Sequence, residues 1–381
     1  MKKIVKILLM MSIIMIGIKL STKVKASDTL IKNSKSGICI EVETGTVLYE
    51  YEADITRFPA STTKIMTIKL IFDAIKNNKI KLNQLLTTSN HASSMGGSKI
   101  FLSPNEQMSV GDLLKAVVIA SANDAAVVLA EAICGTEENF VKLMNDEAKR
   151  LKMNNTNYKN VTGLHDSNHY TSARDLSIIS RELLLNYEED VIKFTSTYED
   201  YLRKDSANPF WLVNTNKLIK RNYGIDGLKT GWTTQAGYCL VATKKENNMR
   251  VISVVLGCDN VDDRSEDTLA LLNYSFSNYE KKMIVRKGTI IESNENILFN
   301  PKNYNIILSE DITKIIKKND ELKDIKYEVE ITNLNNNYLD IGNIKVYIDG
   351  VFYNSYKLQL DKKREKASFI NLLKTLLNNI F

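Results

Sequence analysis

The 381-residue sequence is poor in three residue types that often define a site: it has four cysteines, four prolines and three histidines. No two cysteines form a CxxC pair, which argues against a disulfide framework and a thiolate metal site. Cys39, Cys239 and Cys258 lie in apolar runs, where a thiol usually behaves as a small buried hydrophobe. His165 and His169 have no third ligand spaced nearby, so we expect a polar loop there. The sequence predicts neither a metal nor a cofactor.

An excess of charge is also absent once the N-terminus is set aside. Residues 1–26 contain six lysines and no acidic residue, so the net charge of +6 disappears without them. Their basic start, the apolar run from Ile7 to Ile18 and the closing Val24-Lys25-Ala26 are typical of a cleaved secretory signal. The run is shorter than the roughly 20 residues of a membrane span. We therefore predict an exported, extracytoplasmic protein with no nucleic-acid partner.

Strands and helices are mixed through residues 27–281, which we expect to form one catalytic domain. A hairpin is predicted from Gly37 to Tyr49, and Pro59 precedes a helical stretch from about Ser61 to Lys76. Further expected elements are a helical stretch from Val110 to Ile133 with a break at 121–124, a helix that begins near Ser172, and neighbouring strands at 238–242 and 251–256. This mixture predicts an α/β fold.

The C-terminal part of the chain has a different pattern. Apolar residues alternate in 325–331 and 344–348, which predicts a small β-rich domain over residues 282–360. Residues 361–381 return to a helical pattern, with a basic start and one apolar face. Such a helix is typical of a segment that lies in a membrane interface. We expect it to hold the protein peripherally on the outer face of the cell membrane, and the alternative is a helix docked on the β-rich domain.

Ser61 and Lys64 are three residues apart near the start of a predicted helix, so both side chains lie on one face. A serine hydroxyl is a poor nucleophile unless a base takes its proton. A lysine serves as that base when burial or a neighbouring cation lowers its pKa. The pair predicts a nucleophile and its base, although the same spacing alone is common in ordinary helices.

Ser121 and Asn123 occupy the predicted break between two helices. The Ser121 hydroxyl is suited to relaying a proton to a leaving amine, and the Asn123 amide is suited to holding a substrate amide. The plainer interpretation is helix capping, because asparagine is a good residue at a helix N-terminus.

Lys229, Thr230 and Gly231 form the third motif. A cation beside a hydroxyl binds a carboxylate, and a glycine lets another backbone approach closely. An adjoining strand edge can pair with an extended substrate. The backbone N–H groups of Ser61 and Trp232 are then placed to form an oxyanion hole. Together the three motifs predict acyl transfer through a serine ester on a substrate with a free carboxylate.

At these motifs the chain resembles the penicillin-binding D-alanyl-D-alanine carboxypeptidases, low-molecular-weight serine enzymes of the SxxK acyltransferase superfamily. The resemblance covers roughly residues 30–280, and the matching segments are 59–67, 121–126, 163–166, 172–176 and 226–238. Ala122 stands where many relatives have glycine, and Trp232 where some have histidine.

The resemblance implies a serine β-lactamase/transpeptidase-like catalytic domain, with an antiparallel sheet, flanking helices and a helical subdomain. It implies removal of the terminal D-alanine from peptidoglycan pentapeptide stems, and acylation by β-lactam antibiotics. Ser61, Lys64 and Ser121 take the catalytic roles. Substrate binding falls to Asn123, Lys229, Thr230, Gly231 and Trp232.

Two other functions fit parts of the sequence. Residues 182–186 match the Glu-x-x-Leu-Asn pattern of the deacylating glutamate in class A β-lactamases, but Glu182 lies inside the helix predicted to begin near Ser172. A non-catalytic wall-binding protein would keep the fold without turnover. The intact Ser61, Lys64 and Lys229 argue against it, because binding alone needs no activated serine.

Overall fold

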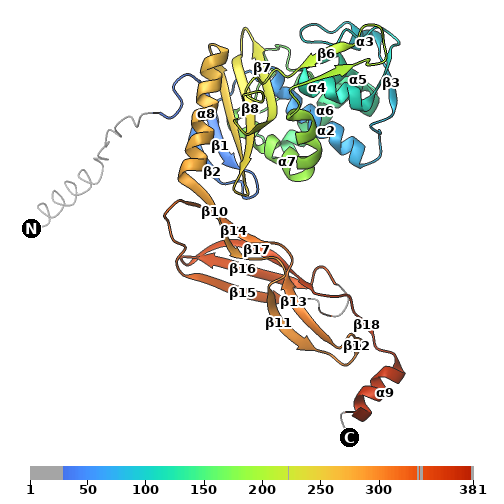
Figure 1. Ribbon diagram of the computed structural model, residues 1–381, viewed down its shortest axis with the longest axis vertical. Helices are drawn as coiled ribbons and strands as arrows, with labels where there is room; N and C mark the ends of the chain where they lie inside the picture. Colours follow the sequence, from blue (N-terminus) through green and yellow to red (C-terminus); the bar gives the residue numbers. More distant parts are fainter. Residues whose placement is uncertain (1–28, 222, 333, 335–337, 379–381) are drawn as a thin grey trace, which may run out of the picture.

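The computed structural model describes residues 29–221, 223–332, 334 and 338–378, so the predicted signal sequence lies outside the described residues. A broad α/β body occupies one end of the molecule in Figure 1, and a narrower all-β part leads from it to the C-terminal helix. Along the chain the α/β body comes first, the all-β part follows, and the helix is last.

A five-stranded antiparallel sheet forms the centre of the α/β body, in the order β2-β1-β9-β8-β7. Its strands are β1 (Ser36–Glu41), β2 (Val47–Tyr51), β7 (Ile225–Thr233), β8 (Gly237–Glu246) and β9 (Met249–Cys258). Every residue of β9 is buried. Alternate β9 side chains enter two different cores, since Ile252 packs with the helical part while Val251 packs on the opposite face.

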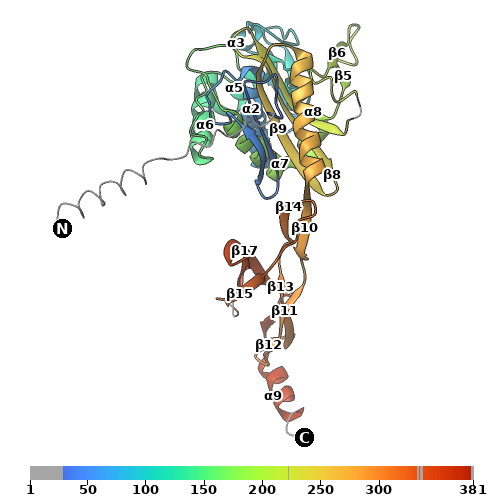
Figure 2. The ribbon, with the colours of Figure 1, turned by 90° about the vertical axis from the view of Figure 1, so that its left-hand side faces the viewer.

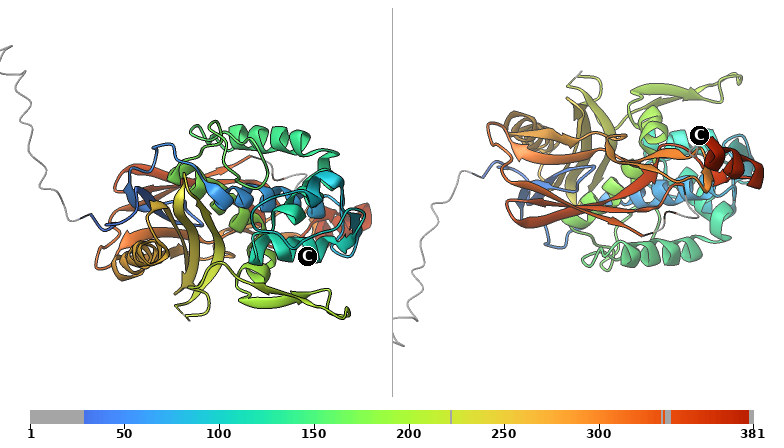
Figure 3. Two further views of the ribbon diagram at one scale, coloured as in Figure 1. Left: turned by 90° about the horizontal axis from the view of Figure 1, so that it is seen from above. Right: turned by 90° about the horizontal axis from the view of Figure 1, so that it is seen from below.

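Helices cover both faces of this sheet. Helix α8 (Val261–Asn278) packs on β8 and β9, and α7 (Ala173–Thr195) packs on β1 and β9 from the other side. Figure 3 shows α8 lying along the outer face, away from the remaining helices. Ser172 caps α7 by accepting a hydrogen bond from the Asp175 N–H at 3.1 Å, as its sequence pattern predicts.

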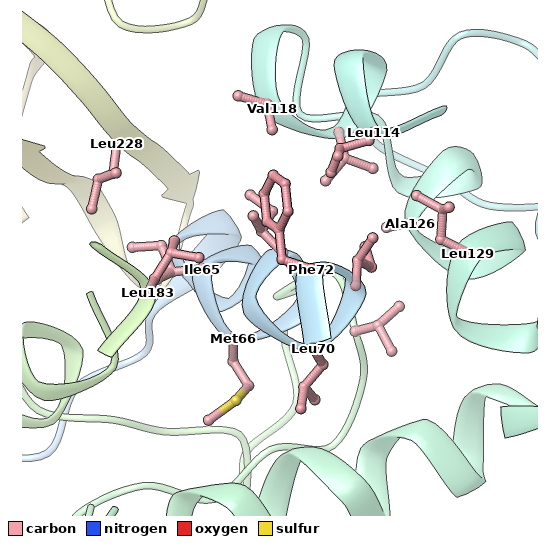
Figure 4. Packing of buried hydrophobic residues seen from close by; sticks show 14 of the residues in the cluster. Ile65, Met66, Leu70, Phe72, Leu114, Val118, Ala126, Leu129, Leu183 and Leu228 are labelled. Atoms are coloured by element: carbon pink, nitrogen blue, oxygen red, sulfur yellow. The ribbon is translucent and has the colours of Figure 1, made fainter. Parts of the chain in front are cut away.

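A helical subdomain surrounds α2. Its elements are η1 (Ala60–Thr63), α2 (Lys64–Lys76), α3 (Asn90–Ser93), α4 (Val110–Ile119), α5 (Asn123–Cys134) and α6 (Glu137–Arg150). Helix α2 is buried on nearly all sides because α4, α5, α6 and α7 pack around it. Figure 4 shows Met66 and Leu70 projecting from one side of it and Phe72 from the other, all into this core. Such packing fixes the start of α2, where Lys64 lies, in a rigid frame.

Two small two-stranded sheets complete the body. Strands β3 (Leu85–Thr87) and β4 (Gln107–Ser109) form one, and β5 (Glu199–Leu202) and β6 (Phe210–Val213) form the other.

The C-terminal part contains a second five-stranded sheet and two shorter strand pairs. The sheet has the order β11-β13-β17-β16-β15, with β11 (Ile290–Glu295), β13 (Asn303–Leu308), β15 (Ile325–Ile331), β16 (Gly342–Ile348) and β17 (Val351–Leu360). The short pairs join β10 (Tyr279–Val285) to β14 (Ile312–Lys317), and β12 (Phe299–Asn300) to β18 (Glu365–Lys366).

The alternating apolar residues predicted in the C-terminal part lie in β15 and β16, and they are buried to different extents in these two strands. The pattern in β16 is confirmed, since its apolar side chains are buried in turn. In β15 the strand is confirmed but the buried face is not, because Tyr327 and Val329 are each 44% exposed on this edge strand.

The terminal helix α9 (Phe369–Asn378) begins later than the helical pattern predicts. Glu365 and Lys366 extend instead as β18, because they pair with Phe299 and Asn300 of β12. In Figures 1 and 2 the helix lies at the far end of the β-rich part from the α/β body. No helix within the described parts of the chain combines the length and apolarity needed to cross a bilayer.

Lys229 lies in a strand that precedes the one predicted near 238–242. This strand, β7, pairs only with β8 in the sheet and forms its edge. The polar stretch 244–250 is mostly strand as well, and Asn247 and Asn248 make the tight turn with positive φ values of 49° and 60°. Two consecutive residues with positive φ suit a two-residue hairpin turn, and asparagine tolerates that conformation.

Candidate active site

Ser61 and Lys64 meet where η1 passes into α2. The Lys64 Nζ donates hydrogen bonds to Ser61 Oγ at 3.1 Å, to Asn123 Oδ1 at 2.6 Å and to the carbonyl oxygen of Thr162 at 2.8 Å. These three acceptors hold the amine beside the serine hydroxyl.

Burial makes the neutral form of Lys64 accessible. Its side chain is fully buried, and this loss of water is the largest cause that holds the pKa of Lys64 well below its usual range. The positive charge of Lys229 lowers the pKa further, while the Asp124 carboxylate acts in the opposite direction. A lysine with a depressed pKa can accept a proton near neutral pH, which a general base must do.

The break between α4 and α5 brings Asn123 into this site. The alternative that Asn123 caps the helix does not hold, because Ala122 is the N-cap residue and no side chain caps the helix. The Asn123 amide instead accepts from Lys64 Nζ and donates to the carbonyl oxygen of Gly96 at 2.7 Å. The side chain therefore connects Lys64 to the loop that contains Gly96.

Ser121 lies in the same break with a free hydroxyl. Its φ is +62°, and its buried Oγ has no hydrogen-bond partner among the described residues. A buried hydroxyl without a partner is costly in a folded protein. Here the hydroxyl is available to a bound molecule.

Lys229 and Thr230 face the cleft from β7. Burial, followed by the charge of Arg264, lowers the pKa of Lys229 to about 7. The Thr230 hydroxyl donates to Thr215 Oγ1 at 2.6 Å. The Lys229 Nζ donates to the backbone carbonyl oxygen of Thr230 at 3.2 Å, so the cation is held on the same part of the edge strand as this pair of hydroxyl groups, and such a combination suits a carboxylate ligand.

Glycines allow η1 to approach β7 and the loop at 163. A Cβ at Gly231 would lie 2.9 Å from the Pro59 carbonyl oxygen and 3.0 Å from the Ser61 nitrogen. At Gly163, where φ is +84°, a Cβ would lie 1.8 Å from the Ala60 carbonyl oxygen. Ala60 itself has a φ of +46°, in the left-handed region that alanine rarely adopts. Ser61 thus follows a strained residue held by close backbone contacts.

The open edge of β7 continues past this contact. Trp232 follows Gly231, and its side chain is 56% exposed beside the cleft. β8 pairs with one edge of β7, and no strand of the described residues pairs with the other, so that edge can accept an extended substrate.

Sequence reasoning missed three groups that complete the site. The Thr162 carbonyl binds Lys64, Thr215 binds Thr230, and Arg264 contributes charge near Lys229. Arg264 is buried, and its Nε has no hydrogen-bond partner in the described part of the chain. Neither residue type nor spacing marks them, since a backbone carbonyl has no sequence signature and the others lie far from the motifs they serve.

Glu182 is engaged elsewhere. It lies on α7 and accepts a hydrogen bond from Arg150 Nη2 at 2.6 Å. The cavity it lines, of about 440 Å³, is formed with residues of β1, α6 and α7, such as Ile38 and Arg181. The cavity at Glu182 therefore includes none of Ser61, Lys64 and Lys229 among its lining residues.

His169 has a packing role under η1. It is buried, its Nε2 lies 2.9 Å from Thr63 Oγ1, and burial lowers its pKa to about 4. Its ring is therefore neutral near neutral pH and supports the segment that contains Ser61.

The fold and the cleft are those of the low-molecular-weight penicillin-binding proteins. A model of the D-alanyl-D-alanine carboxypeptidase family matches residues 22–260, and the chain belongs to this family. It is similar to the D-alanyl-D-alanine carboxypeptidase DacF of Bacillus subtilis, with 41% identity over 92% of this chain and 90% of that protein.

Solved structures agree with this assignment. The structure of penicillin-binding protein 5 from Haemophilus influenzae aligns with a TM-score of 0.70 and 31% identity, over 88% of this chain and 98% of that one. A penicillin-binding protein of Listeria monocytogenes in its ampicillin-bound form aligns with a TM-score of 0.58 and 32% identity, over 64% of this chain and 97% of that one. The predicted transpeptidase-like fold is confirmed.

Proposed function

We propose that this protein is a serine-type D-alanyl-D-alanine carboxypeptidase that removes the terminal D-alanine from the pentapeptide stems of peptidoglycan. The observation that carries the proposal is the position of the buried Lys64 amine, within hydrogen-bond distance of both Ser61 Oγ and Asn123 Oδ1. Membership of the carboxypeptidase family supports the choice of substrate. A reaction on peptidoglycan takes place outside the cytoplasm, which agrees with the predicted signal sequence.

In this reaction the neutral Lys64 amine takes the proton of Ser61 as Oγ attacks the carbonyl carbon of the penultimate D-alanine. The carbonyl electron pair moves onto the oxygen, which faces the backbone N–H groups of Ser61 and Trp232. Breakage of the C–N bond leaves an ester on Ser61, and Ser121 relays a proton to the departing D-alanine amine. Water then attacks the ester, and the shortened peptide leaves.

Lys229 and Thr230 determine which end of the substrate enters. The carboxylate of the terminal D-alanine binds the Lys229 ammonium and the Thr230 hydroxyl, so the scissile carbonyl lies over Ser61. Asn123 binds the amide that precedes it. A β-lactam carries a carboxylate and a reactive amide in the same relation, and we propose that penicillin acylates Ser61.

The first test compares the wild-type chain, residues 27–381, with Ser61→Ala on a D-alanyl-D-alanine pentapeptide. The variant should release D-alanine at least about 10⁴-fold more slowly, because no covalent intermediate forms. Labelling by fluorescent penicillin should disappear with it. Ser206→Ala, which removes an exposed hydroxyl on the β5–β6 loop, is the matched control and should keep both activities.

Two outcomes would count against the carboxypeptidase. Absence of both labelling and D-alanine release from the wild-type chain would favour a non-catalytic wall-binding protein. Turnover of penicillin as fast as that of peptide would favour a β-lactamase.

We also propose export through residues 1–26 and a division into a catalytic domain at 27–281, a β-rich domain at 282–360 and a membrane-binding segment at 361–381. The exposure of α9 supports the last assignment, since Phe369 and Ile370 are 78% and 66% exposed. Basic residues precede this helix in the sequence, which suits a surface of anionic lipids.

The membrane assignment predicts that the mature chain sediments with anionic lipid vesicles and that a chain ending at residue 368 does not. The double variant F369S/L373S should weaken sedimentation as deletion does, because it removes apolar area from α9. Val351→Ser changes an equally exposed apolar residue on β17 and is the control. Equal sedimentation of the mature and shortened chains would refute the anchor.

A further inference from the structure

A basic pocket lies beside the catalytic cleft at the end of β7. Its lining includes Lys35, Arg57, Phe58, Tyr170, Gln235 and Ala236, and its volume is about 300 Å³. We call it the Arg57 pocket. Arg57 and Phe58 come shortly before Ser61, and Gln235 and Ala236 lie in the turn from β7 to β8.

The contact between η1 and β7 keeps the Arg57 pocket next to the nucleophile. Gly231 approaches the Pro59 carbonyl and the Ser61 nitrogen, so the segment that carries Arg57 is fixed against the strand that carries Trp232. The Phe58 ring also packs edge-on against the His165 ring, with centroids 4.8 Å apart. The wall of the pocket is therefore a continuation of the wall of the cleft.

The charge of the Arg57 pocket is of one sign. Lys35 and Arg57 both line it, no lining residue is acidic, and neither cation forms an ion pair with a described carboxylate. Arg57 is held in place by donating from Nε to Ser36 Oγ at 2.8 Å and from Nη2 to the Lys35 carbonyl oxygen at 3.0 Å. A positioned guanidinium beside a lysine, without a carboxylate, is suited to an anionic ligand.

The direction of a bound substrate follows from the cleft and rests on the proposed function. With the terminal carboxylate at Lys229 and Thr230 and the scissile carbonyl at Ser61, the upstream residues extend past Trp232 toward the end of β7. An extended peptide advances about 3.4 Å per residue. The residues just upstream of D-alanyl-D-alanine therefore reach the turn that contains Gln235, at the mouth of the Arg57 pocket.

We propose that the Arg57 pocket binds a carboxylate of the stem peptide upstream of D-alanyl-D-alanine, which makes the enzyme selective for acidic stems. Two carboxylates have this chemistry: one on the side chain of the third residue when that residue is a diamino diacid, and the free α-carboxylate of a γ-linked glutamate at the second residue. Either one forms a charge-assisted contact with Arg57 and Lys35.

The test measures peptide binding to the Ser61→Ala variant by calorimetry, so that turnover is not needed. Four pentapeptides are compared: one with both upstream carboxylates, one with only the third-residue carboxylate amidated, one with only the second-residue carboxylate amidated, and one with both amidated. We expect the fully amidated peptide to bind about fivefold more weakly than the fully acidic one. The single amidation that reproduces the loss identifies the source.

Charge removal in the Arg57 pocket should abolish this selectivity. In the Ser61→Ala background, K35Q/R57Q should bind the acidic and fully amidated peptides equally. Lys149→Gln removes a charge from a lysine side chain that is 81% exposed on α6 and should keep the full ratio. Thermal unfolding of each variant shows whether it is folded, and Lys35→Gln alone serves if the double variant is not.

Equal binding of acidic and amidated peptides by the Ser61→Ala protein would overturn the proposal. An equal loss of selectivity in Lys149→Gln and K35Q/R57Q would also overturn it. That result would mean that the preference for acidic peptides comes from long-range electrostatic attraction to the protein and not from binding in the Arg57 pocket. Failure of the proposed function has a different signature: the wild-type chain would release no D-alanine from any peptide, while the acidic preference in binding would persist.

Discussion

Replacing Lys64 with methionine is expected to slow acylation of Ser61 by about 10³-fold, within the range that loss of a general base usually produces. The amine is the group beside Ser61 Oγ that can take its proton, and burial holds the pKa of Lys64 well below its usual range. Methionine has a similar volume and fills the buried site without a charge. The rate of labelling by fluorescent penicillin, followed in time, measures the effect directly.

A thermal unfolding curve for Lys64→Met is the necessary control, since the lysine also binds Asn123 and the Thr162 carbonyl. A folded variant that labels within tenfold of the wild-type rate would show that another group accepts the proton.

Replacing Lys229 with alanine is expected to lower kcat/KM on D-alanyl-D-alanine peptides by about 10²-fold, because a charge-assisted contact with the carboxylate is lost. The ratio of this kcat/KM to that of the matched D-alaninamide peptide should fall by the same factor. The loss of the Lys229 charge also removes one cause of the low pKa of Lys64. The acid limb of the acylation profile should therefore move to higher pH.

The contact between Lys229 and the substrate carboxylate should also affect how KM of the wild-type enzyme depends on pH. Lys229, with a pKa of about 7 in the free protein, is charged below that pH and neutral above it. Binding of a carboxylate is therefore strongest below pH 7, and KM for the carboxylate substrate should rise as pH increases through this value. KM for the D-alaninamide substrate should stay flat over the same range, and parallel curves would contradict the carboxylate role.

The residue types of the site were predictable because its chemistry requires them. A serine, a lysine three residues later and a later Lys-Thr-Gly each have a recognisable form, and the structure brings Ser61, Lys64 and Lys229 to one cleft. The sequence could not show how their neighbours close the cleft. Thr215 lies in the segment that follows β6, where its hydroxyl accepts a hydrogen bond from Thr230. A contact between two hydroxyl groups leaves no periodic pattern in the sequence from which it could be predicted.

Local signals were misleading where tertiary contacts prevailed. Asparagine is a common helix-capping residue, but the amide oxygen of Asn123 accepts a hydrogen bond from the buried Lys64 and caps no backbone N–H group. The alternating residues of β15 are partly buried only at its ends, where Ile325 and Ile331 pack on the core, while Tyr327 and Val329 between them are exposed on this edge strand. At the C-terminus the helical pattern from 361 onward gives way to strand pairing up to Lys366.

The left-handed backbone conformations of Ala60 and Ser121, two residues of the active site, lower the stability of the folded domain. Each such residue opposes folding by about 1–3 kcal/mol, and the packing around α2 has to offset it. Weakening that packing, for instance at Phe72 or Leu114, lets these two residues relax before the domain unfolds. Damage to the core should thus be detected as slower acylation at temperatures well below the melting temperature.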